Sequence, residues 1–209
     1  MLVIPTARLV FLSVPKTGTS AYQAALATHA AIVVTDPPEL KHAPVFRYNR
    51  FFRPMVEKFF TEKMDLLAVM REPVSWLGSW YRYRRRPFMQ GRANATHDVT
   101  FDEFVTAYTQ GQRPAFANVG SQAKFLEPQR NGTAVTHLFR YEDQTGLKKF
   151  LEERLQTTVE TPIRNASPEM PLTLSPETEG RLRRKSEREF RLWESIGDGG
   201  AYTPLQDKV

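Results

Sequence analysis

The chain has 209 residues, of which 41% are hydrophobic and 25% are charged, a composition typical of folded globular proteins and not of disordered ones. It contains no cysteine, which excludes disulfide bonds, thiolate metal sites and cysteine nucleophiles. The formal net charge of +6 favours anionic partners, a class that includes nucleotides, acidic glycans, nucleic acids and membrane surfaces.

The length suits a single domain, which we expect to span residues 1–209. No apolar run reaches the roughly 18 residues that a membrane-spanning helix needs, and the first residues lack the features of a signal peptide. We therefore expect a cytoplasmic protein without a membrane span. No recognised DNA- or RNA-binding motif is present, so a nucleic-acid partner is not expected.

The predicted elements begin close to the N-terminus. The apolar run at 9–14 predicts a first strand, and Thr19 or Ser20 is expected to cap the helix that follows. His29 is expected on the apolar face of this helix. Residues 32–34 predict a second strand, which the following Asp-Pro-Pro sequence ends.

The rest of the chain continues the alternation of strands and helices. In chain order we expect a helix at 51–63, a buried strand at 65–70, a helix from Pro73 to about Arg86, a helix at 101–108, a strand at 134–139, a helix at about 143–155, a loop at 162–174, and a last helix opened by Ser175 and stopped by Gly197. This order predicts an α/β fold with a mostly parallel central sheet covered on both faces. Its ligand site is expected at the carboxyl ends of the strands.

The loop between the first strand and the first helix has the composition of an anion site. It runs Val-Pro-Lys-Thr-Gly-Thr-Ser over residues 14–20, where free N–H groups and a helix dipole converge. Gly18 allows the main chain to curl around an anion, and Lys16 adds a positive charge. The loop's hydroxyl groups add further donors, from Thr17, Thr19 and Ser20. It is not a Walker A loop, in which the lysine follows the second glycine. The alternative is an ordinary turn with a solvated lysine.

A second candidate anion anchor follows the strand at 65–70. Arg71 can hold a phosphate with paired donors, and Ser79 adds a hydroxyl. The alternative is that Arg71 pairs with Glu72 and that Ser79 is only a small helix residue. Two anchors at one edge of a sheet would suit a ligand that carries phosphates at both ends.

These two motifs resemble those of the sulfotransferases that use 3′-phosphoadenosine 5′-phosphosulfate (PAPS). In that family a loop similar to 15–20 holds the 5′-phosphosulfate, and an arginine, a proline two residues later and a serine eight residues after the arginine hold the 3′-phosphate. Arg71, Pro73 and Ser79 match this spacing. By the resemblance, Lys16 bridges the phosphosulfate and stabilises the leaving phosphate. The remaining donors of that loop would then be Thr17, Gly18, Thr19 and Ser20.

The resemblance implies a P-loop-containing nucleotide-hydrolase-like three-layer fold. It also implies transfer of a sulfuryl group from PAPS to an acceptor hydroxyl, with release of 3′-phosphoadenosine 5′-phosphate (PAP) and without a metal. Further segments look like the bacterial and carbohydrate branch of the family, which makes a glycan one expected acceptor. These segments are 120–122, 139–143, 165–168 and 190–193. The Arg-Lys-Gly segment of the cytosolic small-molecule enzymes is absent, because 183–185 is not followed by glycine.

A base that removes the acceptor's proton would assist such a transfer. His42 is the expected base, because a histidine titrates near neutral pH and because the Lys-His pair at 41–42 resembles the corresponding segment of the carbohydrate and bacterial branches. The alternative for His42 is a hydrogen-bonded loop histidine, with Glu39 and Glu142 as substitute bases. His29 and His137 are expected to be structural.

Other interpretations stay open. The stripe formed by Trp76, Trp80 and Tyr83 favours core packing over acceptor binding. A variant P-loop nucleotide-dependent kinase would need a magnesium-binding acid at a strand end, whereas Asp65 begins its strand. A PAPS-binding protein without catalysis is the third possibility. The acceptor and the oligomeric state do not follow from the sequence.

Overall fold

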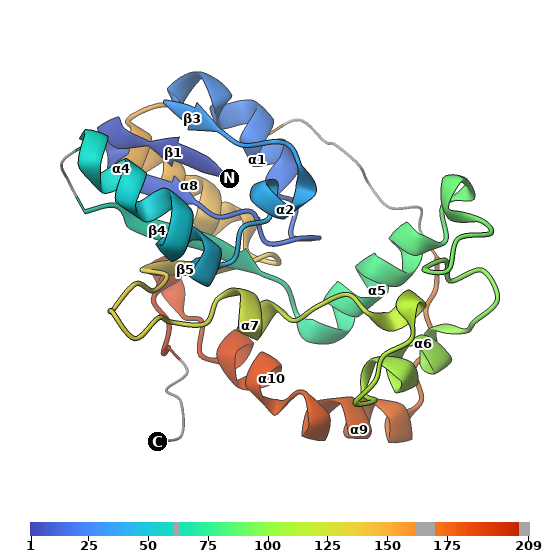
Figure 1. Cartoon of the computed structure of the whole chain (residues 1–209). Coiled ribbons are helices and arrows are strands. Elements are labelled where there is room, and N and C mark those ends of the chain that lie inside the picture. The colour runs from blue at the N-terminus through green and yellow to red at the C-terminus, as the bar shows by residue number, and fades with distance from the viewer. Residues whose placement is uncertain (61–62, 162–169, 205–209) are drawn as a thin grey trace.

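The computed structural model describes residues 1–60, 63–161 and 170–204. Its strands form one sheet with the order β3–β1–β2–β4–β5 (Figure 1). The strands are β1 (Leu2–Ile4), β2 (Leu9–Phe11), β3 (Ile32–Val33), β4 (Asp65–Met70) and β5 (His137–Arg140). The chain is thus an α/β protein, and the strand expected at 65–70 is confirmed.

Helices connect and flank these strands. The α-helices are α1 (Thr19–Leu26), α2 (Pro38–Lys41), α3 (Val45–Arg47), α4 (Arg53–Phe60), α5 (Pro73–Arg84), α6 (Phe101–Tyr108), α7 (Gln122–Phe125), α8 (Gln144–Leu155), α9 (Pro176–Lys185) and α10 (Glu187–Glu194). The shorter elements are η1 (Pro5–Ala7), η2 (Ala27–His29), the π-turn η3 (Tyr48–Phe52), η4 (Pro87–Met89), η5 (Ala115–Ala117) and η6 (Asp198–Gly200). In the described part of the chain, no helix is both long enough and apolar enough to cross a membrane.

The sheet is mixed, because one strand, β1, runs against the direction of the others. β2, β4 and β5 run parallel, whereas β1 is antiparallel to both β2 and β3. Only the short connection at 5–8 separates β1 from β2, and a connection that short joins antiparallel strands; a parallel pair needs a crossover of about a dozen residues or more. The sequence patterns did not predict β1.

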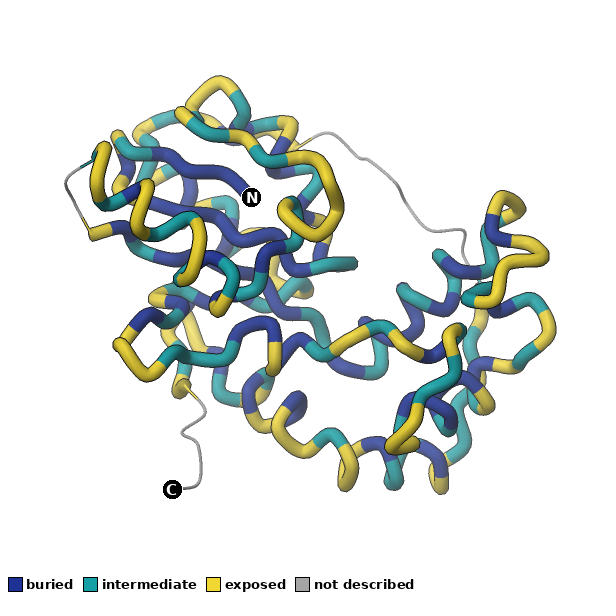
Figure 2. Tube along the Cα trace, viewed as in Figure 1, coloured by how far each residue is buried: buried dark blue, intermediate teal, exposed yellow. Residues whose placement is uncertain are grey.

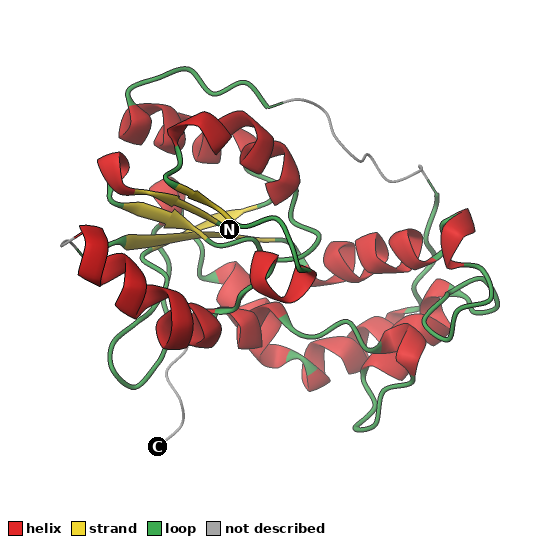
Figure 3. Cartoon of the chain, turned by 45° about the horizontal axis from the view of Figure 1, so that its top comes forward, coloured by secondary structure: helices red, strands yellow, loops and turns green. Residues whose placement is uncertain are grey.

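Helices cover both faces of the sheet (Figure 3). Because side chains alternate along a strand, each strand contributes residues to the cores on both faces. Val10 of β2 lies in a core cluster with Val45 and Val56 of the α3–α4 side. Leu9 and Phe11 lie in the opposite cluster, which α1 and α8 complete. The loops that follow β2, β4 and β5 therefore meet at one edge of a sheet that is held from both sides.

A third hydrophobic cluster lies outside the sheet, where α5, α6, α9 and α10 pack together (Figure 1). Trp76 and Leu77 of α5 contribute to it, together with Phe104 of α6 and Leu182 of α9. Figure 2 shows that buried positions continue from the strands into this helical part. Only Arg71 and Glu72 separate β4 from α5, so α5 connects the sheet with the helical part.

Several predicted boundaries differ from the structure. The strand expected at 9–14 is β2 and ends at Phe11. The strand expected at 134–139 is β5, His137–Arg140. His29 is exposed in η2, so its placement on an apolar face is wrong. The helix expected at 51–63 is confirmed over α4 (Arg53–Phe60), whereas its first two residues belong to the π-turn η3, with Pro54 just after this turn. Residues 61–62 of the expected range lie outside the described residues. Proline cannot donate the helical hydrogen bond, which accounts for an irregular turn before it.

The last helix is broken into two. Ser175 caps it as expected, its Oγ accepting from Thr178 N. At Ser186 the backbone leaves the helical region, with φ −121° and ψ 30°, and α10 starts in a new direction. The two helices pack differently on either side of the break: Leu182 of α9 lies in the helical cluster, whereas α10 places Phe190 in that cluster and Leu192 in the cluster of the sheet.

Candidate functional site

Two residues of the loop between β2 and α1 have left-handed backbone conformations. Lys16 has φ 66° and Gly18 has φ 73°. Gly18 is the N-cap residue of α1, without a side-chain cap, so the expected capping by Thr19 or Ser20 is wrong. A left-handed conformation costs a residue with a Cβ roughly 1–2 kcal/mol, so Lys16 holds an unfavourable backbone at the start of a helix. Residues of this kind cluster at binding sites.

The hydroxyl groups of this loop differ in what they do. Thr17 is buried and its Oγ1 donates to Val14 O at 2.9 Å, which holds the loop together. Thr19 is also buried. Ser20 accepts a hydrogen bond from Lys41 Nζ at 3.2 Å, so α2 lies against the loop. Gly18 is exposed, and the free start of α1 is therefore accessible there.

Arg71 follows β4 directly and is held on both its backbone and its side chain. Its N–H donates to Gln122 Oε1 at 2.9 Å, and its carbonyl accepts from Gln122 Nε2 at 2.8 Å. Its Nε donates to Ser75 Oγ at 2.9 Å. Glu72, with which Arg71 was expected to pair as an alternative, instead caps α5 by accepting from Val74 N and Ser75 N. The guanidinium is thus directed by α5 and not by an ion pair with Glu72.

Ser79 lies one turn beyond Ser75 on the same side of α5. Only 4% of its surface is exposed. The serine that contacts Arg71 is Ser75, a residue to which the sequence motif assigned no role. Ser79 therefore lies behind Ser75 as seen from Arg71, along the start of α5.

Tyr141 joins the two motifs. Its ring centroid lies 4.3 Å from the Arg71 guanidinium carbon, and a Cβ placed on Gly18 would be 3.1 Å from its Cε2. β5 carries Tyr141 to this edge, where its N–H donates to Met70 O at 2.7 Å. The loop after β2 and the arginine after β4 therefore meet across one aromatic ring. The segment containing Tyr141 resembles the sulfotransferases, but no pattern in the sequence indicates that Tyr141 would join the anchors.

Lys16 lies against aromatic side chains of α5. Its Nζ is 4.3 Å from the ring centroid of Tyr83 and 5.7 Å from that of Trp80. The three aromatic residues of α5 therefore have different roles. Trp76 is buried and donates its Nε1–H to Pro15 O at 2.9 Å, whereas Trp80 and Tyr83 contact Lys16. Cation–π contacts of this kind hold an ammonium group without neutralising it.

The charge around Lys16 is positive. The pKa of Lys16 is lowered to about 8, first by burial and then by the charges of Arg86, Arg71 and Arg82. Burial also lowers the pKa of Arg71. None of these four side chains forms an ion pair with a carboxylate in residues 1–60, 63–161 and 170–204. A bound anion would relieve their mutual repulsion, so this edge of the sheet is electrostatically suited to one.

His42 follows α2 and contacts the base of the same loop. Its Nδ1 lies 2.7 Å from Ser13 O, and because a carbonyl oxygen only accepts, Nδ1 carries the hydrogen. Nε2 of the neutral ring therefore keeps its lone pair. Burial lowers the pKa of His42; the Ser13 hydrogen bond opposes this effect, and the charges of Lys41 and Lys16 add to it. A ring that is neutral near pH 7 suits a base.

The two substitute bases are placed differently. Glu142 accepts from Glu72 N at 3.0 Å and from Trp193 Nε1 at 3.4 Å, so its carboxylate holds three parts of the chain together. Glu39 is exposed on α2. Within the described ranges, no group of three or more histidine, aspartate or glutamate residues is arranged to hold a metal ion.

No protein-family model matches the sequence, and no curated protein is similar to it. Assignment of a function to this site therefore depends on the geometry and charges described above, together with the motif resemblance.

Proposed function

We propose that this chain is a PAPS-dependent sulfotransferase with a P-loop-like three-layer fold, acting on a hydroxyl acceptor such as a carbohydrate. The observation that carries the proposal is the meeting of two anion anchors, one from each of two neighbouring parallel strands, across Tyr141. The proposal is also supported by four neighbouring cations that form no ion pair with a carboxylate of the described residues. PAPS carries a phosphosulfate at one end and a 3′-phosphate at the other, and so needs two anchors.

In this proposal the loop after β2 binds the phosphosulfate. Its residues Lys16, Thr17, Gly18, Thr19 and Ser20 surround the start of α1. The backbone N–H groups and the Lys16 ammonium supply the contacts, because the hydroxyl of Thr17 is used within the loop. Arg71 and Ser79 bind the 3′-phosphate, and Ser75 directs the Arg71 fork.

The reaction is a displacement at sulfur. The acceptor oxygen attacks the sulfur, and the bond between sulfur and the bridging oxygen breaks. PAP leaves with that electron pair, and the acceptor's proton passes to Nε2 of His42. Lys16 stabilises the charge that develops on the leaving phosphate. The remaining contribution of the protein is to position the two substrates in line, and no metal takes part.

The binding step is tested by calorimetry with PAP and with ATP, without magnesium. We expect a preference for PAP, because ATP lacks the 3′-phosphate. The Arg71→Ala variant should lose the preference and bind PAP at least about tenfold more weakly, since a charge-assisted hydrogen bond contributes about 1.5–3 kcal/mol. Arg92→Ala, which removes an exposed arginine from the loop after η4, is the matched control and should bind as the wild type does.

The outcomes separate the alternatives. Equal affinity for PAP and ATP, or an Arg71→Ala variant that binds normally, would contradict the proposal and favour a kinase. If PAP binds as expected, sulfation of a panel of hydroxyl acceptors is measured with wild type and with His42→Asn, whose amide can still donate to Ser13 O. Activity lost in His42→Asn with PAP binding retained would support the base. Binding without any transfer by the wild type would favour a PAPS-binding protein without catalysis.

A further inference from the structure

Exposed hydrophobic side chains concentrate on one segment, from α3 to α4. Seven large hydrophobic residues are exposed in the described part of the chain, and four of them lie here. They are Phe59 at 70% exposure, Phe51 at 58%, Phe46 at 46% and Met55 at 39%. Phe51, Met55 and Phe59 are four residues apart and so follow one side of the helix. Figure 2 shows exposed positions recurring along this segment.

The core does not explain these side chains, because the other side of the same segment already supplies the residues that pack on the sheet. Val45, Tyr48 and Val56 are buried there, and Phe52 and Phe60 are partly buried against the same cluster. The segment therefore has two apolar sides, one packed against the sheet and one in contact with solvent. An exposed apolar patch of this kind marks an interaction surface.

Basic side chains accompany the exposed rings. Arg47 lies 5.6 Å from the centroid of Phe46, Arg50 lies 5.3 Å from that of Phe51, and Lys58 lies 5.8 Å from that of Phe59. In the described residues, none of these three cations forms an ion pair with a carboxylate, because Glu57 is taken by Arg53 at 2.7 Å. Residues 45–63 contain five basic and two acidic residues, a net charge of +3.

We propose that this basic aromatic face, formed by Phe46, Arg47, Arg50, Phe51, Met55, Lys58 and Phe59, binds the surface of an anionic membrane. The rings enter the boundary between headgroups and acyl chains, and the cations contact the lipid phosphates. The helix lies in the plane of the surface and does not cross the membrane. This inference is independent of the proposed transferase function.

Charge and shape favour a membrane over the other occupants. A second copy of the chain using the same face would bring the basic side chains of both copies together, since a two-fold interface pairs a patch with itself. The exposed residues lie along the outer side of a helix, which fits a flat anionic surface. An acidic protein surface is the remaining occupant, and the experiment below distinguishes it.

The test is co-sedimentation of the full chain with vesicles of phosphatidylcholine alone or of an equimolar mixture with phosphatidylserine. We expect binding to the anionic vesicles only, weakening as salt is raised. Each basic residue near such a surface contributes about fivefold to partitioning, so Arg50→Gln/Lys58→Gln should bind about 25-fold more weakly. Phe51→Ser/Phe59→Ser should weaken binding by about tenfold or more, because it removes the apolar anchor.

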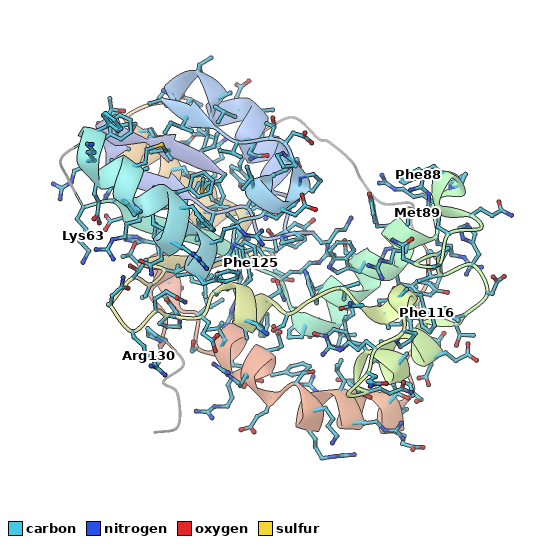
Figure 4. The ribbon with its side chains drawn as sticks, viewed as in Figure 1. Lys63, Phe88, Met89, Phe116, Phe125 and Arg130 are labelled. Carbon is cyan, nitrogen blue, oxygen red and sulfur yellow. The ribbon has the colours of Figure 1, made fainter. Side chains whose placement is uncertain are left out.

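The matched control is Phe88→Ser. Phe88 is 53% exposed but belongs to the helical part of the molecule. Figure 4 shows it on the opposite side of the molecule from Lys63, which lies near α4. The control variant should bind vesicles as the wild type does, and unchanged circular dichroism of every variant would show that all of them fold. Absence of binding by the wild type would overturn the proposal in favour of an acidic protein partner. Equal binding to both vesicles, or a concentration-dependent dimer that Phe51→Ser/Phe59→Ser abolishes, would also overturn it.

Discussion

Lys16 combines an unfavourable backbone with an unfavourably placed charge. Its φ of 66° is one that side chains with a Cβ rarely adopt, and its ammonium is partly buried among arginines. The rings of Tyr83 and Trp80 offset part of the cost of this charge. Both the left-handed backbone and the partly buried charge of Lys16 destabilise the fold. Such an arrangement is expected at a binding site, where the free energy of binding an anion offsets these costs.

Two substitutions separate the backbone cost from the charge. Lys16→Ala and Lys16→Gly both remove the ammonium, but only glycine adopts the left-handed conformation without strain. We expect Lys16→Gly to be more stable towards urea than Lys16→Ala by about 1 kcal/mol. Alanine keeps the cost of the left-handed conformation, and glycine's greater loss of entropy on folding offsets part of this difference. Both should lose PAP binding to the same extent. Equal stabilities would show that the left-handed conformation at this position carries no strain.

Glu189 links α10 to the candidate site through the short helix α7. Its carboxyl group is fully buried, and burial raises its pKa. It accepts from Ser121 Oγ and from Ala123 N at 3.1 Å, on either side of Gln122. Gln122 in turn holds the backbone of Arg71 through two hydrogen bonds. Glu189 is therefore a positioning residue that acts on Arg71 through Gln122.

Removing this carboxyl group should affect both stability and binding. Glu189→Ala leaves a buried donor, Ala123 N, and a part-buried one, Ser121 Oγ, without their acceptor, so we expect a loss of roughly 2–3 kcal/mol in the free energy of unfolding. PAP binding by the folded variant should weaken as well, because the Arg71 backbone loses its support. Glu187→Ala on the same helix is the control: Glu187 is exposed, 3.6 Å from Arg191, and its loss should change stability by less than about 0.5 kcal/mol. Normal PAP affinity in a destabilised Glu189→Ala would limit Glu189 to a role in folding.

The sequence predicted the elements with strong local signals. Pro73 at a helix start, the strand at 65–70 and the helix at 101–108 all have clear patterns, and the structure confirms them. β1 was missed because three apolar residues before a proline resemble any short apolar run. The break at Ser186 was also missed, and no local pattern encodes how the helices on its two sides pack against two separate clusters.

The candidate site shows the same division. Residues that follow parallel strands were expected at one edge, and Gly18 and Arg71 both lie close to Tyr141 there. The roles of Tyr141 and Gln122 depend on contacts between distant parts of the chain. Tyr141 lies 123 positions after Gly18, and Gln122 lies 51 positions after Arg71. No local pattern encodes such contacts. Whether each predicted residue touches a ligand stays a prediction.

The proposed ligand would bridge two separately packed parts of the molecule. The loop at 12–18 extends from the sheet, whereas α5 packs mainly in the helical cluster. In the structure these parts are joined by the step from β4 to α5 and by contacts such as Trp76 Nε1 to Pro15 O. A ligand held by Lys16 at one end and by Arg71 and Ser79 at the other would add a further connection between them.

Hydrogen exchange followed by mass spectrometry tests this bridging. With PAP at about 100 times its Kd, amides that exchange only from the unbound protein should slow by about a hundredfold. We expect this protection in the loop at 13–20 and in the first turns of α5 together, because one ligand contacts both. β3 and α4 serve as internal controls and should exchange as before, because the proposal assigns neither of them a contact with the ligand. Protection of the loop without α5 would mean that the anion site binds one phosphate group and that Arg71 is not part of it.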